Sequence, residues 1–219
     1  MEKFVTKKGA LTEYIGSKEI VKLPYRVKRI KQLAFFSHES MKEIVLTKYV
    51  EQIDEGVFDF CNELENIIVR KDNPVYTSVD GCLYNKELDT FIKYPASKEN
   101  DVYKVLETVK TIKKDAFNCS TKLKDIILPE GLKCIENAAF QDCRNLTKII
   151  LPESLEIIKD HAFYGCESLK EIIIPKNVKE IGNYVFNGCE GLEKIIILGN
   201  PVIAEFGLSS IEGVEIIRK

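Results

Sequence analysis

The sequence contains no tryptophan, only two histidines and two methionines, and no long apolar run. Its longest apolar stretches, such as residues 195–198, are far shorter than the roughly 20 residues that a helix needs to cross a bilayer. With 32 basic and 34 acidic residues the net charge is −2, so bulk charge gives no attraction to nucleic acid or anionic lipid. We therefore expect neither nucleic-acid binding nor membrane insertion.

The first residues, MEKFVTKKGALTEYI, also lack the apolar centre of a signal peptide. The sequence as written therefore predicts a cytoplasmic protein whose thiols stay reduced. The alternative is an extracellular or cell-surface location, if an export signal has been removed or is not recognisable.

Groupings of residues that support catalysis or metal binding are missing as well. The seven cysteines include no CxxC pair with zinc-site spacing. His38 begins HESMK, which lacks the second histidine of the HExxH zinc-protease motif, and His161 stands alone. No glycine-rich phosphate loop is found. We predict no enzymatic activity, no cofactor and no metal site.

What the sequence does contain is a repeat of 23 residues. AAFQDCRNLTKIILP (138–152) and HAFYGCESLKEIIIP (161–175) place Phe, Cys, Leu, Ile and Pro at the same positions. A unit this short cannot bury its own apolar side, but stacked units form continuous ladders of like side chains. The phenylalanine column is Phe35, Phe58, Phe117, Phe140, Phe163 and Phe186, and nine residues after each stands Ile44, Ile67, Ile126, Ile149, Ile172 or Ile195.

The alternating, β-branched IIL and III segments favour short parallel strands, which would stack about 4.8 Å apart into one curved sheet. The small residue, Phe and polar spacers of each AFxxC segment are typical of a tight helical turn on the opposite side. The expected fold class is therefore α/β, in the form of a solenoid.

One interval departs from the period. Phe58 and Phe117 are 59 residues apart, which is two periods plus 13 residues. The surplus lies in NPVYTSVDGCLYNKELDTFIKYP (73–95), where Asp80-Gly81 is a two-residue turn signal between strand-forming residues. We expect an inserted β-hairpin there, and a shorter version in FVTKKGALTEY (4–14).

The pattern LxxIxLPxxLxxIxxxAFxxC resembles the BspA-type leucine-rich repeat family, and the insert DGCLYNKELDTFIKYP resembles that family's interruption. The resemblance implies a right-handed horseshoe with a parallel concave sheet and short helical turns on the outer side, which binds other molecules, mostly proteins. It brings no catalytic residues. We interpret 1–219 as a single leucine-rich repeat domain with an N-terminal cap (1–22), the insertion (73–95) and a C-terminal cap (199–219).

A cysteine column follows the phenylalanines by three residues, at Cys61, Cys143, Cys166 and Cys189. We interpret these cysteines as small, weakly polar residues that fill a buried ladder. Disulfides between neighbouring coils are the alternative.

Two columns next to the core isoleucines are predicted to lie on the concave face, because side chains alternate along a strand. The charged column alternates in sign, so neighbouring coils should form ion pairs. The apolar column reflects either the preference of isoleucine for strands or a docking surface. The candidate binding residues are Ile68, Ile127, Ile150, Ile173 and Ile196, with Asp125, Lys148, Glu171 and Lys194.

The leading hypothesis is a non-enzymatic module that binds a protein or peptide through this face. Self-association through the concave face or a solenoid end is a variant of that hypothesis. The alternative function is an adhesin-like domain, since many relatives in the resembling family are surface proteins of host-associated bacteria.

Overall fold

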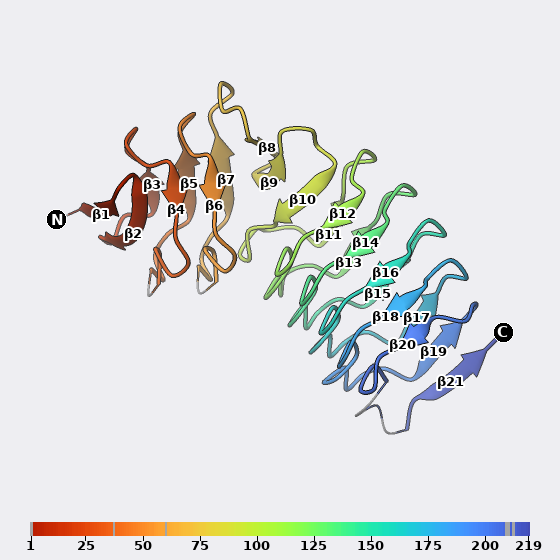
Figure 1. Ribbon diagram of the computed structural model, residues 1–219. Coiled ribbons are helices and arrows are strands. Elements are labelled where there is room, and N and C mark those ends of the chain that lie inside the picture. Colours follow the sequence, from red (N-terminus) through yellow and green to blue (C-terminus); the bar gives the residue numbers. More distant parts are fainter. Residues whose placement is uncertain (1, 37, 60, 209–210, 212) are drawn as a thin grey trace. The chain divides into compact units, whose positions relative to one another are not determined.

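The computed structural model describes residues 2–36, 38–59, 61–208, 211 and 213–219 (Figure 1). The chain divides into two compact units, Met1–Glu87 with Tyr94–Lys98, and Leu88–Lys93 with Glu99–Lys219. In both units successive coils of the repeat add strands to parallel sheets, so each is a β-solenoid. Of the predicted caps, residues 1, 209, 210 and 212 lie outside the described residues.

The first unit begins with an antiparallel hairpin and continues as two parallel ladders. The hairpin is β1 (Lys3–Lys7) and β2 (Ala10–Ile15). One ladder continues from β2 through β4 (Arg29–Ile30) to β6 (Gln52–Ile53). The other is β3 (Ile20–Lys22), β5 (Glu43–Leu46) and β7 (Asn66–Val69).

In the second unit each coil contributes two strands, one on each side of the core. The shorter strands form one parallel ladder: β10 (Thr90–Lys93), β12 (Thr111–Ile112), β14 (Cys134–Ile135), β16 (Ile157–Ile158), β18 (Glu180–Ile181) and β20 (Val202–Ile203). On the other side lie β11 (Val102–Lys104), β13 (Asp125–Ile127), β15 (Lys148–Ile149), β17 (Glu171–Ile174), β19 (Lys194–Ile197) and β21 (Glu215–Arg218), which we call the longer strands.

The insertion contains the expected antiparallel hairpin, formed by β8 (Tyr76–Val79) and β9 (Cys82–Asn85). Asp80 and Gly81 have φ of 49° and 70°, the left-handed pair that a two-residue hairpin turn requires. Lys8 and Gly9 repeat this geometry between β1 and β2, with φ of 50° and 78°.

A buried amide fixes the start of the insertion. The Asn73 Nδ2 group donates to the carbonyl oxygens of Thr47 and Val50 at 2.8 and 3.0 Å. Its Oδ1 accepts from the backbone N–H groups of Val75 and Tyr76 at 2.8 and 2.7 Å. All the polar capacity of this side chain is used, so it ties the insertion to the preceding coil.

The predicted phenylalanine ladder is confirmed. Within the second unit the rings stack with centroids 4.6–5.8 Å apart and interplanar angles of 15° or less, and Phe91 of the inserted segment extends the row. The core isoleucines of the longer strands are also buried, which confirms the strand phase. The stacked rings are, in order, Phe91, Phe117, Phe140, Phe163 and Phe186.

The predicted helical turns are wrong, and so is the α/β class, because no helix occurs in the part of the chain that the structure describes. The phenylalanine segments donate alternate N–H groups to the next coil, as from Phe140 to the Ala162 carbonyl at 2.8 Å. A helix would direct every N–H back along its own chain. The residue two before each phenylalanine has positive φ, which turns the peptide out of a helical path. These residues are Leu33, Gly56, Asp115, Ala138, His161 and Tyr184.

All seven cysteines are thiols in the structure. In the column, the Sγ of Cys143 donates to the Phe117 carbonyl at 3.1 Å, and Cys166 does the same to Phe140 at 3.2 Å. Burial raises the pKa of the Cys143 thiol to about 12. Ser120 occupies this position one coil earlier, and its buried Oγ has no hydrogen-bond partner among the described residues. Cys143, Cys166 and Cys189 therefore form a buried hydrogen-bonded ladder, which the Ser120 hydroxyl does not extend.

Candidate interaction surface

Side chains of the longer strands alternate between the core and solvent. On β13, Ile126 is 1% exposed and Ile127 is 46% exposed. The same outward position holds Ile150 and Ile173, which are 66% and 44% exposed, and Ile196, which is half-buried. In the second unit this column and the charged column beside it form what we call the isoleucine face. Ile68 has the same outward position, 40% exposed, on β7 of the first unit.

The expected ion pairs along the charged column are mostly wrong. Asp125, Lys148 and Glu171 form no ion pair within the described residues, and only Lys194 does, with Glu215 at 3.4 Å. Pairs form instead one position earlier in the strands, as between Lys124 and Asp101 at 3.1 Å. The charges of Lys148 and Glu171 therefore remain available on the isoleucine face.

The longer strands do not form one continuous sheet. β11, β13 and β15 form one three-stranded sheet, and β17, β19 and β21 form another. No backbone hydrogen bond joins residues 147–151 to residues 170–175. The isoleucine face is thus interrupted between β15 and β17, in the middle of the exposed isoleucine column.

Proline contributes to this interruption. The coil after Pro175 has Leu198 in place of the proline. The Leu198 N–H donates to the Ile174 carbonyl at 3.0 Å, and β17 and β19 share four register pairs. Pro152 and Pro175 occupy the same position in their coils and have no N–H to donate. β13 and β15 share only two register pairs, and β15 and β17 are not paired.

A hollow of about 620 Å³ lies at this interruption. Its charged lining consists of Lys148, Glu153, Lys170 and Glu171, of which only Lys170 forms an ion pair within the described residues, with Glu193 at 3.7 Å. Its apolar lining is formed by Ile149, Ile150, Leu151, Ile173, Pro175 and Leu198. The sequence predicted the isoleucines, Lys148 and Glu171 but missed the hollow, for which the repeated prolines were the only signal.

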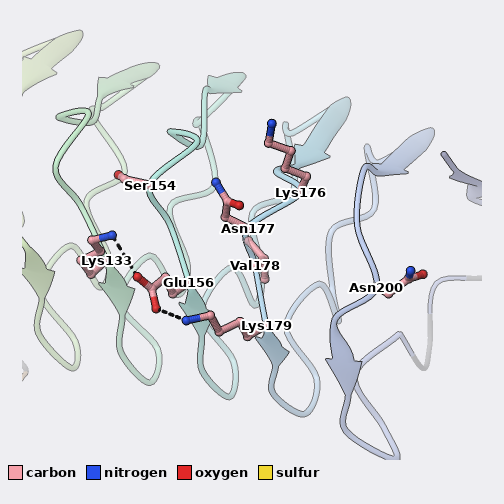
Figure 2. Close-up of a pocket in the computed structure, with 8 residues that line it drawn as sticks. All are labelled: Lys133, Ser154, Glu156, Lys176, Asn177, Val178, Lys179 and Asn200. Carbon is pink, nitrogen blue, oxygen red and sulfur yellow. Dashed lines mark hydrogen bonds and ion pairs between the residues drawn. The ribbon is translucent and has the colours of Figure 1, made fainter.

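A second hollow of about 430 Å³ is polar (Figure 2). In Figure 2 the ammonium groups of Lys179 and Lys133 converge on Glu156 from the two neighbouring coils, at 2.5 and 2.9 Å. Hydrogen bonds from Lys179 and then Lys133 lower the pKa of Glu156 to about 2. Ser154 and Asn177 donate to backbone carbonyls of the preceding coil. These side chains already bond to one another or to backbone carbonyls, which favours a structural role for the residues of this hollow.

Neither histidine belongs to a reactive cluster. His38 hydrogen-bonds to the Tyr14 carbonyl, and the His161 ring stacks on Tyr184 with centroids 5.4 Å apart. Across the described residues there is no group of three metal-ligating side chains. Those residues also include no helix long and apolar enough to span a membrane.

The coils, their phenylalanine row and the parallel strands define a leucine-rich repeat solenoid. The chain matches the family model of the BspA type leucine-rich repeat region, in six copies over residues 13–103 and 96–205. It therefore belongs to that family, as its sequence pattern predicted. No match to a functionally curated protein was found.

Solved structures with this fold come from bacterial proteins. The pneumococcal vaccine antigen PcpA is 30% identical, with a TM-score of 0.78 over 91% of this chain and 57% of that protein. A leucine-rich cell surface protein of Faecalibacterium prausnitzii is 29% identical, with a TM-score of 0.80 over 89% and 52%. A leucine-rich repeat protein of Eubacterium ventriosum is 27% identical, with a TM-score of 0.65 over 91% and 48%. The chain spans about half the length of these proteins.

Proposed function

We propose that this chain is a non-enzymatic scaffold that binds a protein or peptide partner through the isoleucine face. The observation that carries the proposal is the row Ile127, Ile150 and Ile173, three outward isoleucines that are each 44–66% exposed. Contiguous apolar surface of this kind often marks a partner site on a soluble domain. An isoleucine chosen only for its strand preference would be equally common on the opposite sheet, yet there the outward positions of β14, β16 and β18 hold Cys134, Ile157 and Glu180.

The fold suits this role for a physical reason. Its side chains are held on stacked coils over a buried core, so little conformational entropy is lost when a partner binds. The charges of Asp125, Lys148, Glu171 and Lys194 beside the apolar column would select the register and the orientation of the partner. Membership of a repeat family that typically supplies scaffolds is consistent with binding and not catalysis.

The test is capture of the partner from a lysate of the source cells by two triple variants. Ile127→Lys, Ile150→Lys and Ile173→Lys together should leave the thermal midpoint nearly unchanged and abolish capture. The control places lysines at Ile157, Glu180 and Val202, the outward positions of β16, β18 and β20 on the opposite ladder of the same unit. Retained capture by the isoleucine variant would show that the partner binds elsewhere.

A second candidate is an adhesin-like role at the cell surface. The observation in its favour is that one similar structure is described as a vaccine antigen and another as a cell surface protein. The competing location is the cytoplasm. Fractionation of the source cells decides between them, since protein found only in the cytosol would exclude adhesion.

A further inference from the structure

We propose that the hollow between β15 and β17 is an anchor pocket for one bulky apolar side chain of an extended peptide segment. The segment would carry an acidic residue on the Lys148 side of the anchor and a basic residue on the Glu171 side. The inference rests on the proposed function, because it names the partner chemistry that the isoleucine face selects.

The first argument for an anchor pocket is the size and lining of the hollow. Its volume of about 620 Å³ lies within the roughly 300–1,000 Å³ that is usual for ligand pockets. Ile150 and Ile173 form its exposed walls, and the otherwise buried Ile149 and Leu151 reach it through the gap between the coils. An aromatic or large aliphatic side chain inserted here would lose its contact with water, which is how a central anchor supplies most of the binding energy of an interface.

The second argument is the pair of charges, Lys148 and Glu171, beside the anchor position. In the continuous parts of the sheet, Asp125 is the register partner of Lys148, and Glu171 is the register partner of Lys194. A continuous sheet would place Lys148 and Glu171 beside each other in the same way. Within the described residues none of these neighbouring charges forms an ion pair with the other, so Lys148 and Glu171 both line the pocket with free charges, beside Glu153 and beside Lys170, which pairs with Glu193 at 3.7 Å. A partner with the opposite order of charges satisfies both.

The third argument is that β15 and β17 form no ladder of backbone hydrogen bonds, which keeps the pocket open. Pro175 removes the N–H that would reach the Leu151 carbonyl, as Leu198 reaches Ile174 one coil later. An open gap costs backbone hydrogen bonds, so the sheet has a defect at the one place where its outward isoleucine is most exposed.

The direct test titrates the ¹⁵N-labelled 219-residue chain with the peptide acetyl-Asp-Ala-Phe-Ala-Lys-amide, in which both charges lie on the same side of an extended backbone as the phenylalanine. We expect a dissociation constant on the order of 1 mM, with amide shifts concentrated in residues 147–151 and 170–174. Replacing the phenylalanine of the peptide with glycine should abolish the shifts. Acetyl-Lys-Ala-Phe-Ala-Lys-amide should bind the native chain about fivefold more weakly, and Lys148→Glu should reverse that preference. Shifts outside the hollow, or the same affinity for all peptides, would overturn the proposal.

Closing the hollow provides the second test. Pro175→Leu introduces the residue that the next coil carries and restores the N–H, so the peptide should no longer bind. Pro129→Leu is the matched control, in the same column but beside strands that already pair. Ile150→Trp fills the hollow from an exposed position and should also abolish binding, even if the proline variant folds poorly. Peptide binding that survives both closures would place the anchor elsewhere.

The two proposals fail in different ways. Ile127→Lys alters the isoleucine face on β13, outside the residues that line the hollow. If this change removes capture of the cellular partner while Pro175→Leu and Ile150→Trp do not, the face is the binding surface and the anchor pocket is refuted. If none of the three affects capture, the proposed function itself is refuted.

Discussion

Neighbouring isoleucines on β13 provide the sharpest test of the strand phase, on which the isoleucine face depends. Ile126→Ala removes three buried carbon atoms from a side chain that is 1% exposed. Transfer of those atoms accounts for about 2.4 kcal/mol, and the cavity left between two coils raises the expected loss to roughly 2–5 kcal/mol. Ile127→Ala removes the same atoms from a side chain that is 46% exposed. Without a cavity, its expected loss is about 1 kcal/mol.

The assay is urea unfolding followed by far-UV circular dichroism, supported by tyrosine fluorescence because the chain has no tryptophan. Repeat proteins can lose cooperativity, so the slope of the transition must agree between the two variants and the native chain before free energies are compared. Ile126→Ala should lower the urea midpoint clearly, and Ile127→Ala should lower it at most half as much while weakening partner capture. Equal losses of stability at the two positions would refute the assignment of Ile127 to the surface.

Four further substitutions test the core, the insertion and the charge ladder. Ser120→Ala should raise the free energy of unfolding by roughly 1 kcal/mol, because it removes a buried hydroxyl without a partner. Ser154→Ala should lower it by a similar amount, because that hydroxyl donates to the Leu132 carbonyl. Urea unfolding measures both changes, and the same sign for both would contradict the reasoning. Asn73→Ala leaves backbone groups at the insertion unpaired and should cost about 3 kcal/mol in the same assay, so a neutral result would show that the insertion is held otherwise. Glu156→Gln should lower stability at pH 7, where the native carboxylate is charged, and the difference from the native chain should disappear as the pH falls from the ordinary pKa of 4.5 towards about 2. Thermal scans across that range measure it, and a difference that grows on acidification would contradict the ion-pair explanation.

The strands and the aromatic row could be predicted because each coil repeats the same apolar columns. Phe140 stacks on Phe163 in the structure because identical side chains at identical positions meet in adjacent coils. The turns before each phenylalanine could not be predicted in the same way. Positive φ usually requires glycine, yet His161 and Tyr184 adopt it because their N–H groups bond to the next coil, at Asn183 and Phe206. That stabilisation comes from the stack and is absent from any one coil taken alone.

The candidate site also has a part that could be predicted from one coil and a part that depends on the stack of coils. The exposure of Ile150 follows from alternation with the buried Ile149 and Leu151 on either side of it, so the sequence predicted it. The interruption beside Ile150 depends on how two coils meet. Pro129, Pro152 and Pro175 look alike in the sequence, but the number of register pairs at their junctions falls from three to two to none. Nothing in the local sequence separates the third junction from the other two, so the coil that opens is determined by the packing of the stack. A repeat protein can in this way open a hollow between two coils without changing its repeat.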